Sequence, residues 1–289
     1  MSPPTVDPAQ VAKAVAALRK HLEKVKAEGK AQLFDGEDDG GEAFSVTVST
    51  RRVPQRGSNK LVPIAIPHPL LDLSTAEVCL IVKDKEGEGH KEAKRRVAAL
   101  EDKCGVAKVL GISKLRNNYK PHEAKRKLCD SYDLFVADAR VIPILPKLLG
   151  KTFFKKRRQP IPIDATKADL GAQIRKAAAS TYAHAGAGTC LHVKVGKPSM
   201  SATHITENAI AAIEGLVASS CVPRGWANVQ AVFMKTNASA ALPLYAAMPD
   251  PNEDRAAREE EKAAKDARKA ERDEAKNASG GRSAVAMRG

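Results

Sequence analysis

The chain has 289 residues, enough for one large or two modest domains with cores of their own. Its 48 Lys and Arg residues against 34 Asp and Glu residues give a formal net charge of +14, which favours a polyanionic partner: nucleic acid first, and an acidic membrane surface second. No stretch approaches 18 apolar residues and residues 1–20 lack the apolar centre of a signal peptide, so we expect neither a membrane-spanning nor a secreted protein.

The first predicted element is an amphipathic helix. Asp7 is a suitable N-cap, Pro8 suits the first helical position, and apolar residues recur every three or four positions from Val11 to Val25. Gly29 is expected to end the helix, and the acidic, glycine-rich residues 35–42 are expected to form a loop.

A half-exposed strand is predicted next, at residues 44–50. Its apolar residues alternate with Ser45, Thr47 and Ser49, so one face is hydrophobic and the other carries hydroxyl groups before Arg51 and Arg52. The proline-rich residues 62–71 are unsuited to a central strand throughout, and we predict that they cross from one structural unit to the next.

The pattern changes at residue 76. A near-continuous apolar run at 76–84 predicts a strand covered on both faces, and strand–helix pairs then continue to a strand at 134–137 and a helix from Val141 that Gly150 caps. Strand and helix alternate three times with short connections, which predicts a parallel sheet flanked by helices. A basic loop, residues 155–158, follows the last helix.

The last folded segment again predicts helices and half-exposed strands. We expect a helix at 168–183, a strand at 190–196, a helix capped by Ser201 with a hydrophobic staple between Met200 and Ile205, and a strand at 229–235. We therefore predict a split α+β domain from residues 1–64 and 165–250, with residues 65–164 inserted as a Rossmann-like parallel α/β domain.

A charged segment follows this domain. Residues 253–276 hold nine acids, eight bases and, as apolar residues, only alanines. We therefore predict a solvated helix within a helical or disordered tail at 251–289. We expect this helix to provide a further docking surface for RNA or protein. Removing the net −1 of this segment, and the +2 of Arg282 and Arg288, leaves +13 on residues 1–252. The positive charge therefore belongs to the folded body.

Sequence motifs for catalysis are missing. The chain has no P-loop, no dinucleotide fingerprint, no HExxH and no GxSxG motif, and its five cysteines form no CxxC pair. We predict no enzyme activity, no cofactor, no metal and no small-molecule substrate. An enzyme built on the Rossmann-like insertion stays a disfavoured alternative, because no glycine loop follows its first strand.

Repeated clusters of cations favour phosphate contact over a merely solvated surface. They lie at 51–56, 94–96, 125–127 and 147–158, and aromatic residues make up only 4% of the chain. Few aromatics disfavour recognition by base stacking, so we expect a structured RNA bound through its phosphates and 2′-hydroxyls. For residues 155–158 the alternative is a solvated loop without a ligand.

Four sequence blocks carry a resemblance to a known family. Residues 66–71 ("IPHPLL"), 132–163, 192–216 (from "HVKVGKPSMSATHITENA") and 226–245 (from "WANVQAVFMKTNAS") together resemble the ribosomal protein L-one family, and among its branches the nucleolar ribosome-biogenesis factors. The resemblance implies the split fold predicted above, with its main RNA surface on the split domain. It departs from the ribosomal members at Ser45, Ala238 and Ser239, and in the charged tail.

The resemblance implies RNA contacts at the outer face of the first strand with Arg51, around "HVKVGK" and in "KTNAS", and the basic loop adds our own candidates. The residues that we predict to contact RNA are Ser45, Thr47, Ser49, Arg51, Arg52, Lys155, Lys156, Arg157, Arg158, Lys194, Lys197, Lys235, Thr236, Asn237 and Ser239.

The function implied is a non-enzymatic ribosome-biogenesis factor in the nucleolus. It would bind pre-rRNA or a small nucleolar RNA in early pre-ribosomal particles, of the small or the large subunit, beside other assembly factors and ribosomal proteins. The alternative is the ribosomal protein of the large-subunit stalk, bound to mature rRNA.

Overall fold

The computed structural model describes residues 6–28, 43–52, 61–84, 90–100, 105–167, 169–184, 186, 188–237 and 239–248. Residues 1–246 form one compact unit and residues 247–289 a second. The predicted acidic loop at 35–42 and the predicted charged helix at 253–276 lie outside the described residues.

An antiparallel sheet joins segments from the two ends of the chain. It contains β1 (Phe44–Thr50), β8 (Cys190–Gly196), β9 (Val229–Lys235) and β10 (Leu242–Ala246) in the order β10-β9-β1-β8. The strands at 44–50, 190–196 and 229–235 are confirmed. The strand β10 was not predicted; its Pro243 is tolerated because an edge strand needs no second set of backbone donors.

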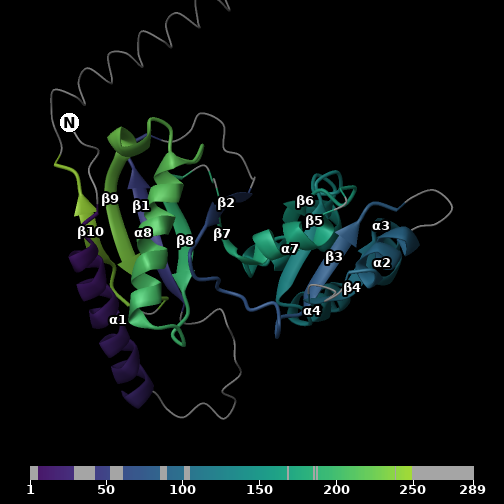
Figure 1. The fold of residues 1–289 in the computed structure, drawn as a ribbon, viewed down its shortest axis with the longest axis horizontal. Helices are drawn as coiled ribbons and strands as arrows, with labels where there is room; N and C mark the ends of the chain where they lie inside the picture. The colour runs from purple at the N-terminus through teal and green to yellow at the C-terminus, as the bar shows by residue number, and fades with distance from the viewer. Residues whose placement is uncertain are drawn as a thin grey trace, which may run out of the picture. The chain divides into compact units, whose positions relative to one another are not determined.

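Two helices cover one face of this sheet. Figure 1 shows α1 (Pro8–Glu28) and α8 (Ala202–Ala218) on the same side of the strands, and their apolar stripes share one core with β1, β8 and β9. The predicted helix starts are confirmed. The Asp7 carboxylate accepts a hydrogen bond from the Ala9 N–H at 2.9 Å, and the Ser201 hydroxyl accepts one from the His204 N–H at 3.2 Å. Since both helices lie on one face, the other face carries the polar side chains.

A second, two-stranded antiparallel sheet corrects two predictions. It pairs β2 (Leu61–Ala65) with β7 (Ser180–His184). Residues 62–65 are predicted as part of a crossing, and residues 180–183 as the end of a helix, yet both form strands. The helix ends at Ala178, and residues 180–184 pair with β2 instead, with Thr181 and Ala183 buried between half-buried or exposed neighbours.

A parallel sheet with helices on both faces confirms the prediction for the middle of the chain. Its strands are β3 (Val78–Val82), β4 (Val106–Gly111), β5 (Leu134–Asp138) and β6 (Ile161–Ile163), in the order β4-β3-β5-β6. All five residues of β3 are buried, as expected for a strand covered on both sides.

The helices divide into two layers. One core joins the sheet to α2 (Lys91–Ala98) and α7 (Leu170–Ala178). The core on the opposite face joins it to α3 (Ile112–Asn118), α4 (His122–Asp130), α5 (Leu145–Leu149) and α6 (Lys151–Lys155). The predicted helix from Val141 begins later, at Leu145, and Gly150, with φ of +73°, separates α5 from α6. The division into a split domain and an insertion with bounds at 64/65 and 164/165 remains our proposal.

Candidate nucleic-acid interface

The outer face of the antiparallel sheet carries three rows of side chains that strand pairing brings together. The register places Ser45 between Lys194 and Lys235, and Thr47 between His192 and Phe233. Ser49 lies between Cys190 and Ala231 in the third row. Because α1 and α8 cover the other face, these rows are the surface that the sheet offers to a ligand.

The first row supplies positive charge around a buried serine. Ser45 is 4% exposed, and its hydroxyl donates to the Lys235 carbonyl at 3.0 Å. This side chain therefore aligns β1 with β9, while Lys194 and Lys235 on either side are half-buried. The two lysines, which are 41 positions apart in sequence, form one cationic row.

The middle row contains an uncharged histidine in a positive environment. The Thr47 hydroxyl lies 3.2 Å from the Nδ1 atom of His192. Burial lowers the pKa of His192 to about 4, and the positive charges of Arg157, Lys235 and Lys194 add to this shift. The imidazole is thus neutral at pH 7, and the same field that disfavours its protonation favours a bound anion.

Asn228 fixes the backbone of Arg51 and Arg52, the two residues that follow β1. The Arg51 N–H donates to the Asn228 carbonyl at 2.9 Å, and the Arg52 N–H donates to the Asn228 side chain at 2.8 Å. The Asn228 amide returns a bond to the Arg52 carbonyl at 3.0 Å. Asn228 is a positioning residue that sequence reasoning missed, because nothing distinguishes a single Asn before a strand.

The turn after β9 contains a buried hydroxyl. Ser239 shapes the turn, because its hydroxyl accepts from the Thr236 N–H at 2.9 Å. Thr236 is fully buried, and within the part of the chain that the structure describes its Oγ1 atom has no hydrogen-bond partner. An unsatisfied buried polar group costs about 1–3 kcal/mol, so this hydroxyl lowers the stability of the free protein. Asn237, beside it, is exposed.

The antiparallel strand directions place these candidates in two groups, at opposite ends of the strands. Lys194, Lys197 and the turn with Thr236 lie where β8 and β9 end, beside the start of β1. Arg51 and Arg52 lie beyond the other end of β1, about 20 Å away at roughly 3.3 Å per residue. One ligand that touches both groups must therefore extend along the strands.

The basic segment 155–158 belongs to the parallel-sheet part of the fold, and two of its four cations are engaged. Lys156 forms an ion pair with Asp130, and Arg158 donates to the carbonyls of Cys129 at 2.9 Å and Tyr132 at 3.1 Å. Both contacts fasten the end of α6 to the end of α4. Lys155 and Arg157 are exposed, and Arg157 adopts a positive φ of 53°.

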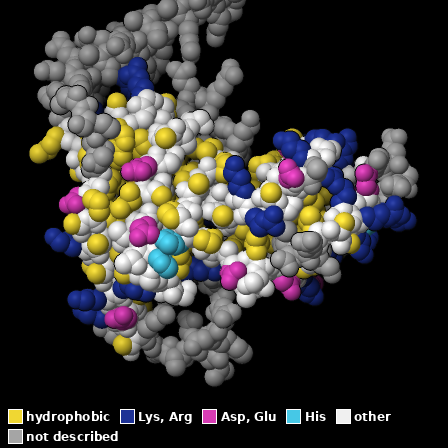
Figure 2. All heavy atoms as spheres, viewed as in Figure 1, with side chains coloured by type: hydrophobic (Ala, Val, Ile, Leu, Met, Phe, Trp, Pro, Cys, Tyr) yellow, Lys and Arg dark blue, Asp and Glu magenta, His cyan; other side chains and the backbone are white. Residues whose placement is uncertain are grey.

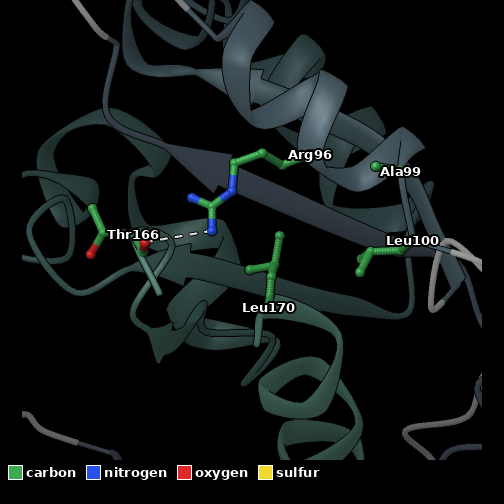
Figure 3. Close-up of a pocket in the computed structure, with 5 residues that line it drawn as sticks. All are labelled: Arg96, Ala99, Leu100, Thr166 and Leu170. Atoms are coloured by element: carbon green, nitrogen blue, oxygen red, sulfur yellow. Dashed lines mark hydrogen bonds between the residues drawn. The ribbon is translucent and has the colours of Figure 1, made fainter. Parts of the chain in front are cut away.

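A hollow between α2 and the start of α7 lacks the groups of an active site. It encloses about 440 Å³ and is lined by Arg96, Ala99, Leu100, Thr166 and Leu170. Figure 3 shows the Arg96 guanidinium pointing to the Thr166 carbonyl, and it also donates to the carbonyl of Ala165. The lining holds no carboxylate, histidine or cysteine, and the Arg96 donors already serve the backbone.

Neither a metal cluster nor a membrane-spanning helix is found among the described residues. Within these ranges, no group of three or more His, Cys, Asp or Glu side chains could hold a metal ion. No helix in the same part of the chain is both long and apolar enough to cross a bilayer.

Comparisons with known proteins point to one family. The model described as "Ribosomal protein L1p/L10e family" matches residues 13–240. A Schizosaccharomyces pombe protein named as a ribosome biogenesis protein is 34% identical over 238 residues, which is 78% of this chain and 61% of that protein. The mouse "Ribosomal L1 domain-containing protein 1" is 27% identical over 245 residues, 83% of this chain and 53% of that protein.

A ribosomal protein is also similar. The large ribosomal subunit protein uL1 of Cenarchaeum symbiosum is 27% identical over 164 residues, which is 57% of this chain and 70% of that protein. The chain thus spans 61% of the Schizosaccharomyces pombe relative and 53% of the mouse relative, less than two thirds of either.

Proposed function

The chain belongs to the ribosomal protein L1p/L10e family, and from this premise we propose that it is a non-enzymatic, RNA-binding factor of ribosome biogenesis. It acts in the nucleolus on early pre-ribosomal particles, where it binds structured pre-rRNA or a small nucleolar RNA. Its partners there are other assembly factors and ribosomal proteins. The similarity to a Schizosaccharomyces pombe relative named for ribosome biogenesis supports the role in assembly.

The observation that carries the RNA-binding part is the composition of the outer sheet face. Strand pairing gathers Lys194 and Lys235 around β1, and hydroxyl side chains lie between them. Burial lowers the pKa of His192 in the same face, and the positive charges of Arg157, Lys235 and Lys194 lower it further. Lysines with hydroxyl groups and few aromatic rings suit phosphate and 2′-hydroxyl contacts to folded RNA.

The test is to identify the RNA that the protein holds in cells. We expect RNA crosslinked to the full chain to be enriched in precursor rRNA, including segments absent from mature ribosomes, or in a small nucleolar RNA. Substituting both Lys194 and Lys235 with Gln should reduce this recovery strongly, while a Lys91→Gln/Lys94→Gln control on α2 should not. Equal recovery from all three proteins would contradict the proposal.

A second candidate function is that of the stalk protein itself, because a large-subunit uL1 protein is 27% identical over 57% of this chain. The distribution of the protein in a sucrose gradient separates the two. An assembly factor is scarce in translating ribosomes, whereas a ribosomal protein is present there in equal amount to its neighbours.

A further inference from the structure

The positive charge of the folded body is concentrated in one segment. Residues 112–158 contain thirteen Lys and Arg residues against four Asp and Glu residues, a net charge of +9. Residues 65–111 contain eight of each and have no net charge. Since residues 1–252 carry +13 in all, about two thirds of it lies in these 47 residues, outside the antiparallel sheet.

The fold places this segment on one side of the parallel sheet. The helices of residues 112–158 are α3, α4, α5 and α6, and all four pack on the same core. The opposite layer consists of α2 and α7. Figure 2 shows Lys and Arg side chains gathered densely over the part of the molecule that holds the parallel sheet. Residues 112–158 thus form a cationic helical layer on one face of the sheet, named here the α3–α6 layer. The helices α2 and α7 of the opposite layer carry a net charge of +5 together, so they provide a matched cationic control.

The four acids of the segment are already engaged. Glu123 pairs with Lys127 at 2.8 Å, Asp130 with Lys156, and Asp138 with Arg140 at 2.7 Å. Asp133 accepts a hydrogen bond from the Glu77 N–H at 3.0 Å. With Lys127, Lys156, Arg140 and the carbonyl-bound Arg158 set aside, nine cations of the layer have no acidic partner within the described ranges.

Six of these nine lie on the helices α4–α6 or directly after them. They are Lys125, Arg126, Lys147, Lys151, Lys155 and Arg157, and the charge of Arg157 also acts on His192 in the sheet face. A Cβ placed on Gly150 would lie 3.9 Å from the Nζ atom of Lys125, which puts α4 beside the start of α6. Lys156 and Arg158 follow α6 and contact Asp130 and Cys129, so the C-terminal end of α6 lies beside the C-terminal end of α4. The two helices therefore run side by side in the same direction.

The backbone that carries these cations is fixed before any ligand binds. Phe153, between Lys151 and Lys155, is fully buried. Its ring packs edge to face on that of Phe135 in β5, with the two ring centroids 4.9 Å apart. Lys151 and Lys155 are four residues apart on α6 and both are exposed, so they project from one face of the helix. A rigid row of cations binds a polyanion without the cost of ordering a loop.

We propose that the α3–α6 layer binds the phosphate backbone of an RNA segment other than the one held by the sheet face. This inference rests on the proposed RNA-binding function and extends it to a second site. Binding here is independent of base sequence, because the layer offers cations and almost no stacking surface. Tyr119 and Tyr132 are half-buried, and Lys108 donates to the Tyr119 hydroxyl at 3.0 Å.

The test measures the salt dependence of RNA binding for the full chain. The probe is a fluorescent RNA hairpin of about twenty base pairs and arbitrary sequence, titrated by anisotropy at several KCl concentrations. The variant is Lys147→Gln/Lys151→Gln/Lys155→Gln, and the matched control, Lys91→Gln/Lys94→Gln/Lys176→Gln, removes three exposed lysines from the opposite layer. Circular dichroism melting confirms that both variants fold.

Removing one lysine–phosphate contact lowers the slope of log K against log salt by about 0.7–0.9, so we expect a fall of about 2–3 for the variant and none for the control. An unchanged slope, or an equal fall in the control, overturns the inference. Competition with polyglutamate provides a second check. If polyglutamate displaces the labelled RNA as effectively as unlabelled hairpin does, the layer binds acidic protein equally well and the inference is overturned.

A third variant separates this inference from the proposed function. Lys194→Gln/Lys235→Gln should weaken RNA binding independently of the helical variant. If only the sheet variant weakens binding, the second site is refuted and the proposed function stands. If the unmodified protein does not bind RNA at all, both are refuted.

Discussion

Arg158 should contribute to the stability of the folded protein and Lys155 should not, although both belong to one run of four cations. Arg158→Met removes two hydrogen bonds from a guanidinium, to the carbonyls of Cys129 and Tyr132, and keeps most of the side-chain length. A hydrogen bond to a charged group contributes about 1.5–3 kcal/mol, and partial exposure of Arg158 reduces that value. We therefore expect a loss of about 2–4 kcal/mol in the free energy of unfolding.

The assay is urea denaturation of the full chain, followed by circular dichroism, with Lys155→Met as the matched control. Lys155 is exposed and has no ion-pair partner among the residues that the structure describes, so its substitution should change the free energy of unfolding by less than about 0.5 kcal/mol. In RNA binding the order reverses: Lys155→Met should lower the salt slope by about 0.7–0.9. Equal destabilisation by both variants would refute the assignment of Arg158 to folding.

Three further predictions concern buried polar groups. Thr236→Val removes the buried Oγ1, so it should raise the free energy of unfolding by about 1 kcal/mol in urea denaturation; a loss of stability would contradict this. Asn208 is fully buried and bonds the backbone of His68 and Val195, so Asn208→Ala should cost about 3 kcal/mol in urea denaturation, against no change for exposed Thr203→Ala. The pKa of His192 is about 4 in the folded state and near 6.5 when unfolded, so the unfolded chain takes up the proton first and stability falls as pH drops from 6.5 to 4. After allowance for partial exposure the loss is about 1–2 kcal/mol, and His192→Gln should flatten this part of the stability–pH profile; an unchanged profile would refute it.

Alternation and continuity of apolar residues were sufficient to predict the main sheets. The hydroxyl-bearing face of β1 and the fully buried β3 both follow from the spacing of Val and Ile residues. The helix start at Ser201 also follows from local chemistry, because its cap involves residues only three positions apart. These features depend on neighbours in sequence.

Strands of mixed composition were harder to predict. Residues 180–184 continue an alanine-rich helix without a breaking residue, so only their pairing with β2 identifies them as a strand. The strand β10 contains Pro243 and irregular pairing, and its pattern shows no simple alternation. Long-range pairing overrides local propensity in both cases.

The candidate site was predictable in residue type and not in detail. The register that sets Lys194 and Lys235 around Ser45 depends on contacts about 150 and 190 positions apart along the chain. Nor does a run of four cations reveal that Lys156 and Arg158 bind α4 while Lys155 and Arg157 face outward. Such assignments require the partners' positions in space.

The most direct test of the central claim is to map where RNA touches the protein. The full chain is bound to precursor rRNA, crosslinked with ultraviolet light and digested, and the peptides that carry nucleotides are identified by mass spectrometry. We predict crosslinked peptides from β1, β8 and the turn after β9, which are distant in sequence and adjacent in the sheet. Efficient crosslinking from which all three segments are absent would contradict the claim that this sheet face binds RNA.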